Sequence, residues 1–131
     1  MEFLKQYEIL YKKAKVDLNV AKITLKTFEN GEIELDLEVI MFHLQQATEK
    51  LLKALLSFNK LHFTKTHDLE KLLNAINENN IKIIDNIAIL LPLSDYAVEG
   101  RYAIIHDDLD SADKYIEILD KFIEFVKKEI K

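Results

Sequence analysis

Residues 99–108 hold the side chains of this sequence that are best suited to chemistry. The run is Glu-Gly-Arg-Tyr-Ala-Ile-Ile-His-Asp-Asp, and it places a guanidinium, an imidazole and carboxylates beside one of the chain's two glycines. The guanidinium of Arg101 can hold a phosphate with two hydrogen bonds. The imidazole of His106 can carry a proton near neutral pH. Together these groups could act on a phosphodiester bond.

The spacing of Arg101 and His106 allows two interpretations. Residues five apart on a regular helix lie about 140° apart around the axis and about 7.5 Å apart along it, so the two side chains do not share a face. The length of arginine, or an adjustment of the turn at Gly100, could still bring them together. Asp110 follows His106 by four residues, so its carboxylate could orient the imidazole and raise its pKa if the helix continues that far. The alternative is an acidic helix end with solvated charges.

The other histidines, His43, His62 and His67, are dispersed along the chain. None of them has the His-x3-His or Glu-x2-His spacing of a metal site. We therefore expect no metal and no cofactor. His67 precedes Asp68, and we interpret it as part of a helix start that Thr66 caps.

Composition limits the class of protein. The chain has 131 residues and a formal net charge of −5, which disfavours broad electrostatic binding to nucleic acid but allows a local basic cleft. It has no cysteine, two glycines and one proline, so disulfides and a glycine-rich phosphate loop are not expected. No apolar run approaches the roughly 20 residues of a membrane span, and the N-terminus lacks the pattern of a signal peptide. We expect a cytoplasmic protein without membrane contact, with a single domain over residues 1–131.

Two long helices are predicted in the first half of the chain. Apolar residues recur every three or four positions over about residues 3–28 and again over about residues 36–59. Gly31 ends the first helix, and we expect the two helices to form an antiparallel pair. The polar residues expected mainly off the apolar face of the second helix are Gln45, Gln46, Glu49, Lys50 and Lys53.

Shorter helices and one further long helix are predicted in the second half. The pattern favours helices over about residues 67–77 and 81–91, with Pro92 ending or kinking the latter. A helix over about residues 95–106 would contain the Arg101–His106 run, and a last helix would cover about residues 112–129. The residues expected to cap the last two helices are Ser94 and either Asp110 or Ser111. The predicted fold is all-α, an up-and-down helical bundle of four to five helices.

Three motifs of this sequence resemble those of HEPN domains (higher eukaryotes and prokaryotes nucleotide-binding). Residues 45–54, Gln-Gln-Ala-Thr-Glu-Lys-Leu-Leu-Lys-Ala, are similar to the second-helix signature of the family. Residues 66–69, Thr-His-Asp-Leu, resemble the start of its next helix, and Arg101 to His106 match its Arg-x4-6-His motif. The resemblance covers almost the whole chain. It implies a HEPN-like bundle of four or five helices, which in this family commonly forms a symmetric homodimer.

The resemblance first implies an enzyme. Many members with Arg-x4-6-His are metal-independent endoribonucleases, often toxins encoded beside a minimal nucleotidyltransferase antitoxin. Arg101 would then bind the scissile phosphate of an RNA, and His106 would act as general base or acid around the ribose 2′-hydroxyl. Two such pairs would face each other across a dimer cleft. The residues that would support this site or contact its ligand are Tyr102, Asp107, Asp108 and Asp110.

Two departures from the toxin pattern support a second interpretation. A polar residue, often Asn, usually follows the Arg, whereas this chain has Tyr102; toxin members often carry Tyr two residues after the His, whereas this chain has Asp108. Another branch carries Arg-Tyr-Pro and is associated with nucleotide binding or with assisting a nucleotidyltransferase, without RNA cleavage. Arg101-Tyr102-Ala103 shares the first two residues of that pattern. The alternative is therefore a non-catalytic, nucleotide-binding HEPN module that partners a minimal nucleotidyltransferase.

Overall fold

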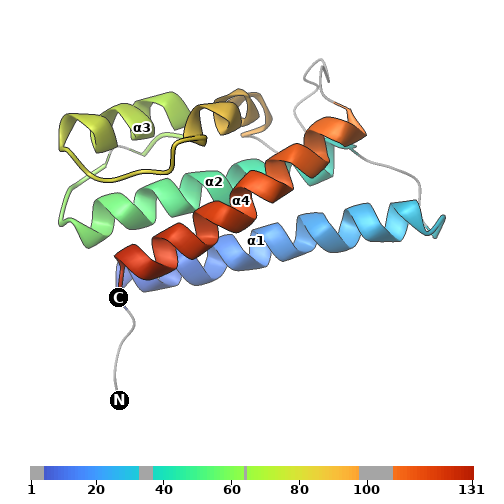
Figure 1. Cartoon of the computed structure of the whole chain (residues 1–131), viewed down its shortest axis with the longest axis horizontal. Coiled ribbons are helices and arrows are strands. Elements are labelled where there is room, and N and C mark those ends of the chain that lie inside the picture. Colours follow the sequence, from blue (N-terminus) through green and yellow to red (C-terminus); the bar gives the residue numbers. More distant parts are fainter. Residues whose placement is uncertain (1–4, 33–36, 64, 98–107) are drawn as a thin grey trace.

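The computed structural model describes residues 5–32, 37–63, 65–97 and 108–131, and within these residues the chain is all-α. The elements in chain order are α1 (Gln6–Glu29), α2 (Leu37–Phe58), α3 (Leu69–Glu78), the 3-10 helix η1 (Ile87–Tyr96) and α4 (Leu109–Glu129). Figure 1 shows the three long helices side by side, with α3 and η1 covering the side of α2 that faces away from α1. The predicted up-and-down bundle of four to five helices is confirmed.

Helix α2 is the centre of the bundle, because it packs against all four of the other elements. Its sequence accounts for this position, since its apolar side chains form a face wide enough for several neighbouring elements. The fully buried residues of α2 include Ile40, Met41, Leu44, Ala47, Leu51, Leu52, Ala54 and Leu56. So wide an apolar face is removed from water only when several helices pack against it.

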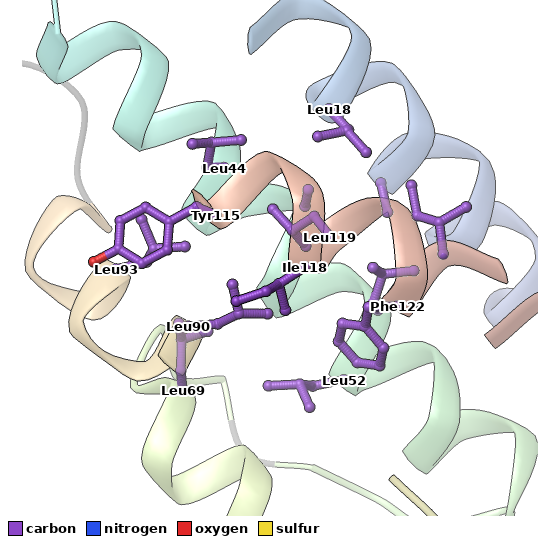
Figure 2. Packing of buried hydrophobic residues seen from close by; sticks show 14 of the residues in the cluster. Leu18, Leu44, Leu52, Leu69, Leu90, Leu93, Tyr115, Ile118, Leu119 and Phe122 are labelled. Atoms are coloured by element: carbon purple, nitrogen blue, oxygen red, sulfur yellow. The ribbon is translucent and has the colours of Figure 1, made fainter. Parts of the chain in front are cut away.

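The core is formed by side chains from all five elements. Figure 2 shows Leu18 of α1, Leu52 of α2, Leu69 of α3, Leu90 of η1 and Leu119 of α4 pointing into one common interior. Each of these side chains is at most 2% exposed. Burial of a leucine side chain stabilises a fold by roughly 1.5–3 kcal/mol, so this shared core holds the short elements onto the long ones.

The region around Pro92 differs from the predicted α-helix over residues 81–91. Residues 81–86 contain no helix, and the 3-10 helix η1 begins at Ile87 and includes Pro92. Proline lacks the N–H that an α-helix needs and clashes with the carbonyl four residues earlier. The isoleucines at 81, 83 and 84 pack partly buried against the core from a segment outside any helix. Apolar periodicity was therefore the correct signal for burial but not for α-helix.

The helix caps also differ from the predicted ones. The N-cap of α3 is Asp68, whose carboxylate accepts hydrogen bonds from the backbone N–H groups of residues 70 and 71, while Thr66 Oγ1 accepts from the N–H of Asp68. The N-cap of α4 is Asp108, so this helix begins before Asp110 and Ser111. Ser94 lies inside η1, and its hydroxyl oxygen accepts a hydrogen bond from the N–H of Leu69 at 3.0 Å. It therefore joins η1 to the start of α3 instead of capping a helix.

Among the described residues, no helix is both long enough and apolar enough to cross a membrane.

Candidate functional site

Most of the predicted site lies outside the described residues. This applies to Arg101, Tyr102, His106 and Asp107, and to the predicted helix over residues 95–106 beyond Ala97. Asp108 and Asp110 are the two predicted site residues that the structure describes. The structure does describe the residues on either side of the segment 98–107.

Asp108 starts α4 directly after this segment. Its carboxylate Oδ1 accepts hydrogen bonds from the backbone N–H of Ser111 at 2.9 Å and from the Ser111 hydroxyl at 3.0 Å. These bonds to Ser111 lower the pKa of Asp108, so the carboxylate is ionised at neutral pH. Asp110 is exposed in the first turn of α4, where the helix dipole favours a negative charge. Both carboxylates thus stabilise the helix start.

The elements on either side of the segment pack together. Chain-order neighbours η1 and α4 contact each other and both contact α2. Leu93 and Tyr96 of η1 and Ala112 and Tyr115 of α4 are all buried in the core. Residues 98–107 therefore join two elements whose positions are fixed by the same core.

The second-helix motif forms a buried polar cluster, which we call the α2–α3 polar cluster and which consists of Gln45, Glu49, Lys53 and His67. Glu49 is only 5% exposed. Its carboxylate accepts hydrogen bonds from three donors: His67 Nδ1 at 2.8 Å, Lys53 Nζ at 3.0 Å and Gln45 Nε2 at 3.1 Å. Gln45 Nε2 also lies 3.4 Å from the backbone oxygen of His67. These hydrogen bonds connect α2 to His67, which lies just before the start of α3.

Two opposed effects set the pKa of Glu49. Burial alone would raise it, but the hydrogen bonds from His67, Lys53 and Gln45 and the charge of Lys53 outweigh burial and hold the pKa below its usual value. A carboxylate that is satisfied in this way is ionised at neutral pH and holds its donors in place. The imidazole of His67 remains 61% exposed, so the cluster is open to solvent on the side of His67.

The burial of these polar residues differs from the sequence prediction. Gln45 and Glu49 are buried, so the expectation that they lie mainly off the apolar face is wrong for both. The spacing of Gln45, Glu49 and Lys53 at four-residue intervals places them on one stripe of α2. This spacing was a signal in the sequence that the three residues lie together. The stripe faces inward because Glu49 has a hydrogen-bond partner in His67.

A second polar cluster joins α1 to α2. Asp17 is buried on α1, with one carboxylate oxygen 3.0 Å from His43 Nδ1 and the other in contact with Lys50 Nζ. This aspartate was not identified from the sequence, because a single acid within an amphipathic helix gives no signal of its own. Among the described residues, no three His, Asp or Glu side chains come together in an arrangement that could hold a metal ion.

Comparison with known proteins assigns the family. Residues 7–130 match the family model described as HEPN domain, which is nearly the whole chain. The chain belongs to the HEPN domain family. The resemblance predicted from the three sequence motifs is confirmed at this level.

Solved structures agree with the HEPN fold. ST0689, described as an archaeal HEPN homologue, is similar with a TM-score of 0.65 and 24% identity over 98% of this chain and 100% of that chain. TT1696 from Thermus thermophilus is similar with a TM-score of 0.71 and 20% identity over 95% of this chain and 98% of that chain. At these identities the two similarities establish the fold alone. No curated protein matches the chain.

Two of the three HEPN-like motifs can now be given a physical role. Residues 45–54 and 66–69 supply every member of the α2–α3 polar cluster and the N-cap of α3. These motifs therefore hold the bundle together.

Proposed function

We propose that this HEPN protein is a metal-independent endoribonuclease of the toxin–antitoxin type, a single domain over residues 1–131 that acts in the cytoplasm as a homodimer. The observation that carries the proposal is the Arg101-x4-His106 run in a chain of this family. The run lies in the segment that leads into the N-cap of α4. The proposed antitoxin partner is a minimal nucleotidyltransferase.

The proposed chemistry is an internal transfer within the RNA. The ribose 2′-oxygen attacks the adjacent phosphorus, the bond to the 5′-oxygen breaks, and a 2′,3′-cyclic phosphate and a free 5′-hydroxyl result. His106 would take the proton of the 2′-hydroxyl or give a proton to the leaving oxygen. Arg101 would bind the phosphate and stabilise the charge that develops on it. Tyr102, Asp107, Asp108 and Asp110 would support these two residues or contact the RNA.

One surface of the described residues fits a homodimer. Ile9, Val16 and Ile23 on α1 are 40%, 60% and 65% exposed, and they are the exposed large hydrophobic residues among those described. Their seven-residue spacing forms one stripe along the helix. In an antiparallel pair of α1 helices centred on Val16, Ile9 would meet Ile23 of the second copy. Such a self-complementary stripe is what a twofold interface requires.

The dimer can be tested by sedimentation. The wild type is expected to sediment as a dimer and Val16→Asp as a monomer with an unchanged far-UV circular dichroism spectrum, because a charge at the centre of the stripe would be buried unpaired. Lys71→Asp, a charge change at an exposed residue of α3, which does not pack against α1, serves as the control and is expected to remain dimeric. A Val16→Asp dimer would exclude this stripe as the interface.

A second candidate function follows from Tyr102. Tyrosine follows Arg101 where ribonuclease members usually carry a polar residue. The corresponding function is a non-catalytic nucleotide-binding module that partners a minimal nucleotidyltransferase. In that case Arg101 would bind a nucleotide phosphate without cleavage.

One experiment separates the two candidates. Purified protein is incubated with a mixed RNA pool in EDTA, and the products are tested for 2′,3′-cyclic phosphate ends. The ribonuclease proposal expects such ends from the wild type and from His62→Ala, a control at an exposed histidine outside the motif, but not from His106→Ala. The second candidate would replace the ribonuclease proposal if no cleavage occurs and a nucleotide raises the melting temperature of the wild type but not that of Arg101→Ala.

A further inference from the structure

His67 is held by a buried carboxylate and still presents its ring to solvent. Its Nδ1 lies 2.8 Å from the carboxylate of Glu49, which is 5% exposed, while 61% of the His67 side chain is exposed. The lowered pKa keeps Glu49 ionised at neutral pH, and an ionised carboxylate can only accept hydrogen bonds, so Nδ1 is the ring nitrogen that donates. Nε2 is left as the nitrogen that can exchange a proton with a ligand.

The other histidine that is paired with a described carboxylate is much less open. His43 Nδ1 lies 3.0 Å from Asp17, and the His43 side chain is only 23% exposed. The second oxygen of Asp17 is in contact with Lys50, so this pair is part of the packing between α1 and α2. Among the described residues, His67 is therefore the histidine that combines a carboxylate partner with a mostly exposed ring.

The link between α2 and the chain before α3 does not depend on this ring alone. Gln45 Nε2 lies 3.4 Å from the backbone oxygen of His67, and Lys53 Nζ also donates to Glu49. A carboxylate that holds one nitrogen of an imidazole fixes the direction of the other nitrogen, and catalytic histidines are oriented in this way. The pairing with Glu49 therefore prepares His67 for proton transfer as well as for packing.

Ser94 connects the chain after His67 with the end of η1. Its hydroxyl oxygen accepts a hydrogen bond from the N–H of Leu69 at 3.0 Å, and its carbonyl oxygen accepts one from the N–H of Ala97 at 3.2 Å. Figure 1 shows α3 and η1 next to each other on one side of α2. His67 precedes Leu69 by two residues, so it lies close to the end of η1. Arg101 follows Ala97 by four residues, and a chain of four residues spans at most about 14 Å.

The proposed cleavage of RNA needs two proton transfers. The 2′-hydroxyl loses a proton as its oxygen attacks phosphorus, and the 5′-oxygen gains a proton as its bond to phosphorus breaks. The attacking and leaving oxygens lie on opposite sides of phosphorus in an in-line displacement, so a single imidazole does not serve both at once. A site that uses His106 as the base therefore needs a separate proton donor.

We propose that His67 is a second catalytic histidine of the ribonuclease site, which gives the proton on Nε2 to the leaving 5′-oxygen while His106 takes the proton of the 2′-hydroxyl. This assignment rests on the proposed function. The ionised carboxylate of Glu49 stabilises the imidazolium from which the proton is given. After cleavage Nε2 of His67 is unprotonated and His106 is protonated, and exchange with water restores both. The competing donor is His106 of the second copy across the proposed dimer cleft.

His67→Asn separates the chemical role of His67 from its structural role. The asparagine amide can still donate to Glu49 in place of Nδ1, but it has no group in place of Nε2. Cleavage of RNA in EDTA should therefore slow at least about 100-fold, since a general acid contributes roughly 10²–10⁴-fold to a rate. The matched control is His43→Asn, the same change at the other carboxylate-paired histidine, which should cleave as the wild type does. Circular dichroism confirms equal folding of the variants.

A change of leaving group tests the proton donor directly. The same RNA is made with sulfur in place of the 5′-oxygen at the cleaved bond, because a thiol is far more acidic than an alcohol and a thiolate leaves without a proton. His67→Asn should cleave this RNA within about tenfold of the wild-type rate, since the leaving atom no longer needs the acid. His106→Ala should remain slow with both RNAs, because the 2′-hydroxyl still has to lose its proton.

Two results would overturn the assignment of His67 and leave the ribonuclease proposal standing. Cleavage of the normal RNA by His67→Asn at the wild-type rate would show that the proton comes from another group, such as His106 of the second copy. An equal loss with oxygen and with sulfur as the leaving atom would show that His67 does not protonate the leaving group. Absence of cleavage by the wild type would instead remove both proposals.

Discussion

Lys53 and Lys12 are both helix lysines, but they lie in different surroundings. The side chain of Lys53 is 14% exposed and donates to Glu49 at 3.0 Å within the α2–α3 polar cluster. Lys12 is exposed on α1, in a surface groove that Lys15 and Lys127 also line, and it has no ion-pair partner among the described residues. A charge that is satisfied inside the protein stabilises the packing of its elements, whereas an exposed charge without an ion-pair partner contributes little to the stability of the fold. The predictions below test this difference.

The largest effect is expected in the α2–α3 polar cluster. Replacing Glu49 by alanine removes the acceptor of three donors at a site that is 5% exposed. A broken buried pair leaves an uncompensated charge, so the free energy of unfolding should fall by about 3 kcal/mol. Urea unfolding followed by circular dichroism measures it. Glu49→Gln, which keeps the shape and one acceptor, should lose less; a loss below about 1 kcal/mol in Glu49→Ala would contradict a structural role.

An effect of pH should arise from the same carboxylate. The folded-state pKa of Glu49 lies below its usual value of 4.5, so its stabilisation is present above that value and is lost as pH falls through the lowered folded-state pKa. The free energy of unfolding of the wild type should therefore drop more than that of Glu49→Gln between about pH 7 and about pH 3. Parallel curves for the two proteins over this range would show that the carboxylate is not stabilised by the fold.

The smallest effect on stability is expected at two exposed lysines, Lys12 of α1 and Lys127 of α4. Lys12→Gln/Lys127→Gln should change the free energy of unfolding by no more than about 0.5 kcal/mol, because neither lysine is paired with a described residue and surface substitutions usually stay within this range. The same urea titration measures it. A loss comparable to that of Glu49→Ala would mean that these lysines stabilise the bundle and would remove the contrast between the two regions.

The long helices could be predicted from the sequence because their signal is local. Apolar residues at three- and four-residue intervals define α1, α2 and α4, and the ordered motifs identified the HEPN family correctly. The burial of Glu49 could not be predicted in the same way, because its partner His67 lies 18 positions away in the sequence. A polar residue on a helix has the same local pattern whether it faces solvent or a partner.

The sequence pattern did not decide which of several neighbouring residues caps a helix, or which form the segment around Pro92 takes. Asp108, Asp110 and Ser111 are all good cap residues, and the structure selects Asp108 because its carboxylate reaches the N–H of Ser111. The isoleucine-rich segment before Pro92 has the composition of a buried element, but periodicity did not indicate that it would pack without an α-helix. The roles of Arg101 and His106 stay a prediction, because both residues lie outside the described part of the chain.

The most direct test of the proposed function is the rate of RNA cleavage in EDTA by the wild type and by His106→Ala, with equal folding confirmed by circular dichroism. A general acid or base contributes roughly 10²–10⁴-fold to the rate. The account predicts cleavage by the wild type and a loss of at least about 100-fold in His106→Ala. Cleavage at the same rate by both proteins, or by neither, would contradict the assignment of His106 to a ribonuclease site.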